Sequence, residues 1–126
     1  MAIVRRFAGM WLAAAVATAP ILAHAADVVA GKAIFDHTCH NCHSLDVGMN
    51  KVGPSLFHIV GRPSGTVEGF MYSDAMKNLH ANWTPATLNA YLENPRDNVH
   101  GVKMNFRGLP DPADRANVIA FLQNQD

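Results

Sequence analysis

The sequence predicts a small all-α domain whose long loops wrap around an internal ligand. Three segments have capped, amphipathic helical patterns, whereas the alternation of polar and apolar residues that is typical of strands is scarce. The segments between these helices are long and rich in Gly, Pro, Asn and Asp. Ordered loops of that length need something to pack against, and a domain of about 100 residues buries only a thin core of its own side chains.

The first 25 residues of the 126-residue chain are predicted to be a signal peptide. Arg5 and Arg6 precede an apolar run from Phe7 to about Leu22, and Ala23 and Ala25 are the small residues that signal peptidase accepts. A membrane anchor is the alternative, but the run is short for a bilayer that needs about 20 residues, and it contains a proline. We therefore expect cleavage after Ala25 and export to the periplasm.

The mature chain, residues 26–126, is predicted to be a single domain without a further hydrophobic span. Loss of Arg5 and Arg6 leaves eight Lys and Arg against ten Asp and Glu, a formal balance of −2. This balance argues against a nucleic-acid partner, and no basic run is present to bind a membrane surface. We expect no nucleic-acid partner and no stable membrane insertion.

The first predicted helix covers residues 27–38 and begins at Asp27, a favourable N-cap. Its pattern places Val29, Ala33 and Ile34 on a shared face. A fourth, shorter helix is expected around residues 73–78.

The two other main helices use the same start signal, a capping residue followed by proline. In the segment TPATLNAYLENP, Thr84 is the cap, Leu88, Tyr91 and Leu92 share a face, and Pro95 is expected to end the helix. The segment DPADRANVIAFLQNQ repeats the signal near the C-terminus. Asp111 is the expected cap, and Asp114 is an acid in the first turn, where it favours the positive end of the helix. The expected apolar face consists of Val118, Phe121 and Leu122.

Cys39, Cys42 and His43 form a C-x-x-C-H motif, and the chain has no other cysteine. A redox pair of the thioredoxin kind needs a βαβ context, which the pattern lacks. A zinc site needs four ligands, and no second Cys/His pair stands at finger spacing. The third interpretation is covalent haem, in which the thiols add to the porphyrin vinyl groups and the imidazole binds iron. We therefore predict one haem c attached through Cys39 and Cys42.

Almost the whole mature length also resembles class I cytochrome c, the small bacterial periplasmic branch. The matching stretches are GKAIFDHTCHNCH, VGPSLFHIVGR, GFMYSDAMKN, W-x7-YLENP across residues 83–95, and GVKMNFRGL. The resemblance implies the cytochrome c fold, with three main helices, one short helix and long loops wrapped around one covalently bound haem.

The resemblance also implies the two axial ligands of the iron. His43 is the proximal ligand, and the carbonyl of Pro54 accepts a hydrogen bond from its other ring nitrogen. Met104 is the sixth ligand, in the loop after the second main helix, and His100 is its rival. A neutral thioether favours Fe(II) and raises the reduction potential.

Further roles are implied around the haem. Tyr91 projects toward it, with its hydroxyl within reach of the methionine sulfur. Tyr72, Trp83 and Arg62 hold a propionate, since buried carboxylates need donors or a cation, although ordinary core packing is the alternative for the aromatic residues. Phe106 covers the exposed haem edge.

The resemblance includes one helix contact and several departures from the family pattern. Phe35 and Phe121 match the packing contact between the first and last helices, where Gly31 allows close approach. Val102 stands where the family usually has Thr, and Met76 where it usually has Asn, so both positions lose a polar group near the haem. Asn98 and His100 also replace the usual Tyr and Pro.

With both axial positions filled by protein, iron has no open site for substrate or oxygen. We expect a carrier rather than an enzyme, moving one electron between a membrane quinol-oxidising cytochrome complex and a reaction centre, oxidase or reductase. The alternatives are a subunit that receives electrons for a periplasmic dehydrogenase and a five-coordinate haem peroxidase or gas sensor. The protein is expected to be a monomer that docks its redox partners transiently at the haem edge. The basic residues expected around that edge are Lys32, Lys51, Arg96, Lys103 and Arg107.

Overall fold

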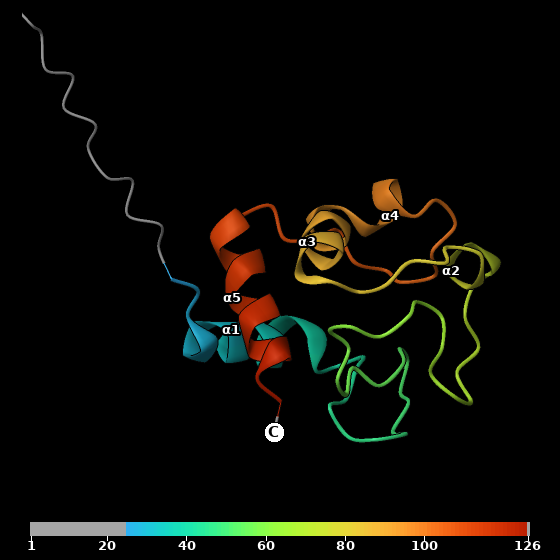
Figure 1. Cartoon of the computed structure of the whole chain (residues 1–126), viewed down its shortest axis with the longest axis horizontal. Helices are drawn as coiled ribbons and strands as arrows, with labels where there is room; N and C mark the ends of the chain where they lie inside the picture. Colours follow the sequence, from blue (N-terminus) through green and yellow to red (C-terminus); the bar gives the residue numbers. More distant parts are fainter. Residues whose placement is uncertain (1–24, 126) are drawn as a thin grey trace, which may run out of the picture.

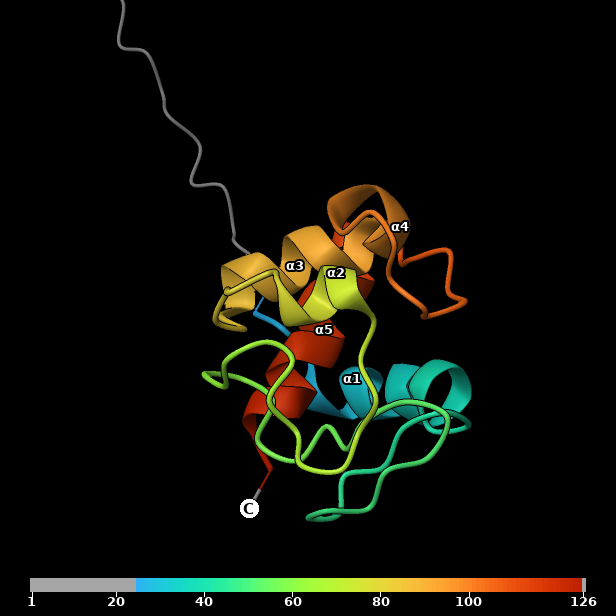
Figure 2. The same cartoon turned by 90° about the vertical axis from the view of Figure 1, so that its right-hand side faces the viewer.

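The computed structural model describes residues 25–125, which form helices, long loops and one isolated β-bridge between Pro63 and Asn82. Two helices cross near the chain ends, and the remaining helices and loops lie to one side of that crossing (Figures 1 and 2). Within residues 25–125 no extended strand forms, which confirms the predicted all-α class. The predicted signal peptide lies, apart from Ala25, outside the described residues.

Helix α1, Val28–Ile34, begins at Asp27, whose carboxylate accepts hydrogen bonds from the backbone N–H groups of the first turn. It continues as a π-helical segment, Phe35–Cys39, which delivers the chain to the C-x-x-C-H motif. The predicted apolar face of this helix is only partly right. Ile34 packs against the core, but Val29 is 80% exposed, Ala33 is exposed, and the buried residues are Gly31 and Phe35. The periodicity of large apolar residues could not show that the contact face is centred on a glycine.

Three helices follow the central loops. Helix α2, Asp74–Lys77, is capped by Ser73 and confirms the short predicted helix. Helix α3, Pro85–Glu93, starts with a capping box formed by Thr84 and Thr87. The chain then breaks at Asn94 and forms α4, Pro95–Asn98, which the sequence analysis did not predict. Pro95 therefore opens a new turn, because its fixed φ suits a first helical position.

The last helix, α5, Pro112–Gln123, is capped by Asp111 and crosses α1. A Cβ added to Gly31 would lie 2.0 Å from the backbone oxygen of Asn117, so only glycine permits this approach. Beside it, the rings of Phe35 and Phe121 pack with centroids 5.4 Å apart. The predicted contact between the first and last helices is confirmed.

Buried Arg115 holds α5, α3 and the loop between them together. Its Nε donates to Asn89 at 2.8 Å, and its Nη1 donates to the carbonyls of Leu109 and Pro110 at 2.7 and 2.9 Å. The charge is thus satisfied by neutral oxygens in a site that is only 6% exposed. Within residues 25–125, none of the helices combines the length and apolar character needed to cross a bilayer.

Candidate functional site

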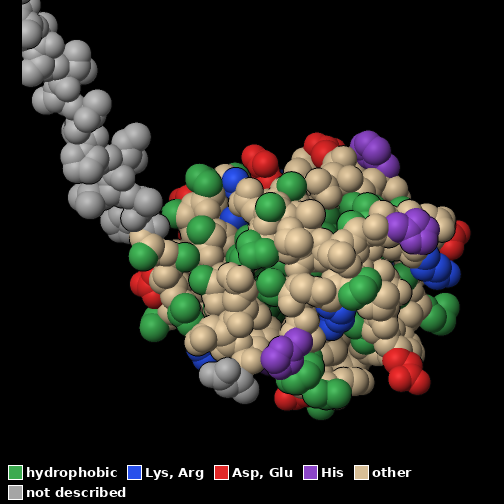
Figure 3. All heavy atoms as spheres, viewed as in Figure 1, with side chains coloured by type: hydrophobic (Ala, Val, Ile, Leu, Met, Phe, Trp, Pro, Cys, Tyr) green, Lys and Arg blue, Asp and Glu red, His purple; other side chains and the backbone are tan. Residues whose placement is uncertain are grey.

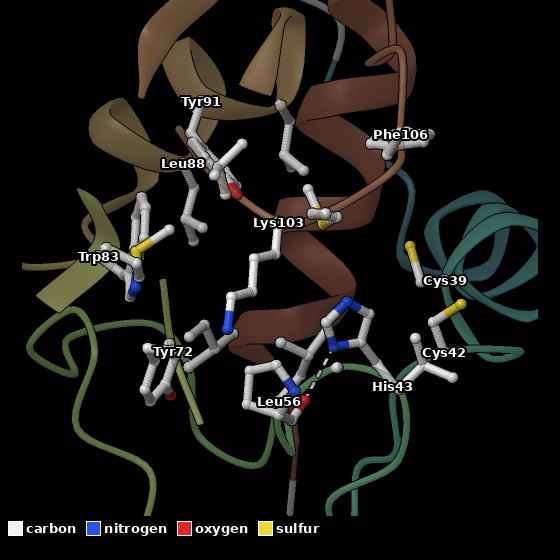
Figure 4. A pocket seen from close by; sticks show the side chains of 18 of the residues that line it. Cys39, Cys42, His43, Leu56, Tyr72, Trp83, Leu88, Tyr91, Lys103 and Phe106 are labelled. Carbon is white, nitrogen blue, oxygen red and sulfur yellow. Dashed lines mark hydrogen bonds between the residues drawn. The ribbon is translucent and has the colours of Figure 1, made fainter. Parts of the chain in front are cut away.

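A cavity of about 560 Å³ opens between the C-x-x-C-H segment, the central loops, α3 and the loop after α4 (Figure 4). This volume lies within the range of small-molecule and cofactor sites. Its wall is mostly apolar and includes Leu56, Ile59, Leu88, Val118 and Leu122. All nine residues that the sequence analysis assigned to the site line this single cavity: Cys39, Cys42, His43, Pro54, Arg62, Tyr72, Trp83, Tyr91 and Met104.

The two cysteines and His43 reach the cavity because the chain turns tightly after the π-helical segment. The backbone N–H groups of Cys42 and His43 both donate to the carbonyl of Cys39, at 3.1 and 2.9 Å. Figure 4 shows the two sulfur atoms along one side of the cavity and the imidazole beside them. Burial, and then the nearby Cys42, raise the pKa of the Cys39 thiol to about 11. The unmodified thiol is therefore neutral at ordinary pH.

The ring of His43 is held from two directions. Its Nδ1 donates to the carbonyl of Pro54 at 2.8 Å, the contact that the resemblance implies. Because a carbonyl only accepts, this bond places the proton on Nδ1 and leaves the lone pair on Nε2. Burial lowers the pKa of His43, which favours the neutral imidazole that a metal ion requires. Gly53 packs against the ring so closely that an added Cβ would lie 2.3 Å from Cε1.

Met104 is half-buried and lines the cavity, whereas His100 is exposed and does not line it. Met76 and Val102, the two departures from the family pattern, also line the cavity, and Met76 is only 7% exposed. Val102 and Met76 present apolar groups where the family usually has an alcohol or an amide. The arrangement thus brings a soft sulfur donor and an apolar surface to the same site as His43.

Aromatic and cationic side chains lie across the cavity from the cysteines. Trp83 and Tyr91 are each 7% exposed, and their ring centroids are 4.9 Å apart. Burial raises the pKa of Tyr91 to about 12, so its hydroxyl stays protonated. The hydroxyl of Tyr72 accepts from the backbone N–H of Val67 at 3.1 Å and keeps its own proton for another acceptor.

Two backbone carbonyls hold the guanidinium of Arg62. Its Nη1 and Nη2 donate to the carbonyls of Phe57 and Ser55 at 2.8 and 2.9 Å, which orient the guanidinium at the cavity wall. Burial lowers the pKa of Arg62, and the nearby Tyr72 opposes that shift. Its remaining N–H groups form no hydrogen bond with residues 25–125 and can meet an anionic group of a ligand.

Three of the basic residues expected around the haem edge are bonded to other groups of this chain and do not form a free cationic patch. Lys32 pairs with Asp36 at 2.5 Å, Lys51 donates to a backbone carbonyl of the C-x-x-C-H segment, and Arg96 donates to a loop asparagine. The amine of Lys103 points into the cavity (Figure 4). The face shown in Figure 3 carries scattered charges of both signs with apolar side chains between them.

The sequence analysis did not predict the contact of Gly53 with the His43 ring or the inward direction of the Lys103 amine. Gly53 was part of the quoted VGPSLFHIVGR stretch, and the G-P pair was a signal that a backbone passes close to another group. Lys103 was expected at the haem edge, and nothing in the sequence showed that its amine would turn inward.

The donor set fits a covalently held haem. Two thiols stand beside a neutral imidazole with a free Nε2, a thioether lines the same cavity, and the wall is apolar. Polar donors from Arg62, Tyr72 and Trp83 also line the cavity, as carboxylates of a buried ligand require. These features suit a large apolar ring that contains a metal and carries acidic groups at one edge.

Comparison with known proteins identifies the family. The cytochrome c family model matches residues 28–126. Cytochrome c-type cyt cy of Rhodobacter capsulatus is 55% identical over 96 residues, which cover 76% of this chain and 48% of that protein. Cytochrome c2 of Rhodopila globiformis is 46% identical over 97 residues, covering 77% of this chain and 92% of the relative. The chain thus spans about half the length of the first relative and nearly all of the second.

A solved structure agrees with these matches. Cytochrome cH from Methylobacterium extorquens superposes with a TM-score of 0.73 at 36% identity, covering 79% of this chain and 99% of that one. The predicted cytochrome c fold and the predicted haem c, attached at Cys39 and Cys42, are confirmed by these comparisons. The chain described here belongs to the cytochrome c family.

Proposed function

We propose that this chain is a periplasmic one-electron carrier, not an enzyme, in which His43 and Met104 would bind the haem iron. Membership of the cytochrome c family supports electron transfer as the general activity. The observation that carries the finer proposal is that one cavity brings together the Cys39–His43 motif and the thioether of Met104. When bound, haem c supplies the Fe(III)/Fe(II) couple.

His43 contributes a ligand whose tautomer and orientation are set before binding. The Pro54 carbonyl accepts from Nδ1 at 2.8 Å, which fixes the ring and increases the basicity of Nε2. The backbone of Gly53 packs against the ring and blocks its movement toward that side. A fixed donor reduces rearrangement when the charge at the site changes by one unit.

Met104 contributes a neutral, soft donor that favours the reduced state. The apolar side chains of Met76 and Val102 line the same cavity and offer no dipole to stabilise additional positive charge. We therefore place this protein at the high-potential end of its family. The hydroxyl of Tyr91 forms no hydrogen bond with any described residue and is available to donate to the thioether sulfur.

Arg62, Tyr72 and Trp83 are proposed to hold the propionates. Their donors lie at the cavity wall, and the guanidinium of Arg62 is oriented by two backbone carbonyls. A cation and neutral donors together compensate for the desolvation of a carboxylate. This arrangement would also keep water from that side of the cavity.

The redox partners are proposed to be a membrane quinol-oxidising cytochrome complex and a reaction centre, oxidase or reductase. Because Lys32 and Lys51 are already engaged with groups of this chain, charge steering toward such partners should be weak. A monomer with transient docking at the haem edge suits this role. Periplasmic location rests on the signal-peptide pattern of the first 25 residues.

Two measurements test this function. The oxidised protein should show the weak near-infrared sulfur-to-iron band, and Met104→Ala should remove the band, lower the midpoint potential and open the iron to carbon monoxide. Ready binding of carbon monoxide to the unmodified reduced protein would instead indicate a five-coordinate haem enzyme or gas sensor. A band that is absent in the wild type but present in His100→Ala would show that His100 is the ligand. Stable copurification with a dehydrogenase would favour the subunit role over a free carrier.

A further inference from the structure

The segment that carries Met104 is held by few hydrogen bonds. Residues 103–108 have no helical or strand structure. On one side, Val102 N–H donates to Val99 O at 3.2 Å, and on the other, Leu109 N–H donates to Leu92 O at 2.7 Å. Between these two hydrogen bonds, the segment has a single hydrogen bond to any residue in 25–125: the Nη2 of Arg96 donates to the Oδ1 of Asn105. Asn105 directly follows Met104 in the chain.

The donor of this bond stands on a rigid support. Arg96 belongs to α4, whose Pro95 is among the most deeply buried side chains of the protein. The turn is closed by the hydrogen bond from Val99 N–H to Pro95 O at 2.9 Å, and Asn94 caps it by accepting from the backbone N–H of Asp97. Since α4 is fixed, movement of the loop away from the helix stretches or breaks this bond.

The downstream end of the segment is also fixed. A Cβ on Gly108 would lie 2.1 Å from the carbonyl oxygen of Glu93, so the loop and the end of α3 are in close backbone contact there. Arg115 binds the carbonyls of the next two residues, Leu109 and Pro110. Movement of the segment is therefore confined to residues 103–107, the loop beside α4 in Figure 2.

We infer that Arg96 and Asn105 form a latch that keeps Met104 in the cavity. The inference rests on the proposed function, in which Met104 is the sixth ligand. Apart from this bond, the segment is retained by the partial burial of Met104 and Phe106. Breaking the latch leaves the thioether free to swing outward, so Arg96 and Asn105 are positioning residues that act through Met104. They hold the ligand in place and limit how often small molecules reach the iron.

Imidazole added to the oxidised holoprotein measures this opening, because it competes with Met104 and abolishes the sulfur-to-iron band. Arg96→Ala and Asn105→Ala should each tighten apparent imidazole binding about three- to tenfold, the range expected from the net contribution of one ordinary hydrogen bond, since this one is exposed to solvent. The double variant should show no larger effect than either single variant. Arg96→Lys, which keeps a donor, should recover part of the wild-type resistance.

Arg107→Ala is the matched control. It removes the same charge from the segment that the latch holds, but Arg107 is exposed and makes no hydrogen bond with any residue in 25–125. Its imidazole affinity should stay within about twofold of the wild type, as is usual for an exposed side chain without a partner. Haem content and far-ultraviolet circular dichroism should be unchanged in all variants.

Two results would overturn the latch and leave Met104 ligation intact. One is a normal sulfur band with imidazole affinities of Arg96→Ala and Asn105→Ala equal to that of Arg107→Ala. The other is a double variant whose effect is the full product of the single effects, which would show two independent contributions. A wild-type protein without the band would overturn Met104 ligation and the latch together.

Discussion

Gly53→Ala should show how strongly the protein depends on the position of the His43 ring. The added Cβ would lie 2.3 Å from Cε1, 2.6 Å from Nδ1 and 2.8 Å from Nε2. Ordinary contact begins at 3.4 Å, so the ring must retreat by about 1 Å, or the loop must move by the same amount. Either movement stretches the 2.8 Å hydrogen bond to Pro54 beyond a useful length.

The cost has two parts. Overpacking against a fixed ring costs about 1–3 kcal/mol, and a half-buried N–H without its acceptor costs about 1–3 kcal/mol more. We expect the free energy of unfolding of the holoprotein to fall by about 2–6 kcal/mol. The midpoint potential should rise, because an imidazole that has lost its hydrogen bond is a weaker donor and stabilises Fe(III) less.

Chemical denaturation and potentiometric titration of the same samples measure both effects. Gly48→Ala is the control, since Gly48 lies in the same loop with a φ of +68° and nothing within 4 Å of an added Cβ. It carries a backbone cost of about 1 kcal/mol and should leave the potential unchanged. A Gly53→Ala protein with the stability and the potential of the Gly48→Ala protein would refute the reasoning.

Four further results are expected. Val102→Thr and Met76→Asn should each lower the midpoint potential, because a hydroxyl or amide dipole at the cavity wall stabilises Fe(III). Gly31→Ala should reduce the free energy of unfolding by about 1–3 kcal/mol, since the new Cβ meets a backbone oxygen of α5 at 2.0 Å. Between pH 10 and 12 stability should fall, because the unfolded chain releases the Tyr91 proton near pH 10 and the folded chain retains it to about 12. Second-order rates with redox partners should depend weakly on ionic strength.

Each of these has an outcome that would contradict it. Unchanged or raised potentials in both cavity variants would show that wall polarity does not set the potential. Wild-type stability in Gly31→Ala would mean that α1 and α5 can separate without cost. The decline in stability between pH 10 and 12 should be smaller in Tyr91→Phe, and an equal decline would assign it to other groups. A steep fall of the rates with added salt would reveal a cationic patch that the engaged lysines do not supply.

Local signals in the sequence were sufficient for the helix starts and for the covalent motif. Asp27, Ser73, Thr84 and Asp111 each cap a helix through their own side chains, so the start of a helix depends on a few neighbouring residues. The end of α3 was harder to predict, because Pro95 both stops one helix and starts the next.

The sequence by itself determined that the chain builds a helical domain around a covalent haem, since the C-x-x-C-H spacing and the capping residues are local. The apolar periodicity of the sequence did not identify the buried face of α1, because that face is defined by the approach of α5 to Gly31 at Asn117, 86 residues further along the chain. The resemblance to the family placed Gly31 at this contact, and only the tertiary structure decided how closely the two backbones approach there. It also decided the packing of Gly53 on the His43 ring and the bond from Arg96 to Asn105. These contacts join residues across loops, and the hydrophobic periodicity of the sequence does not predict which residues of two loops will meet.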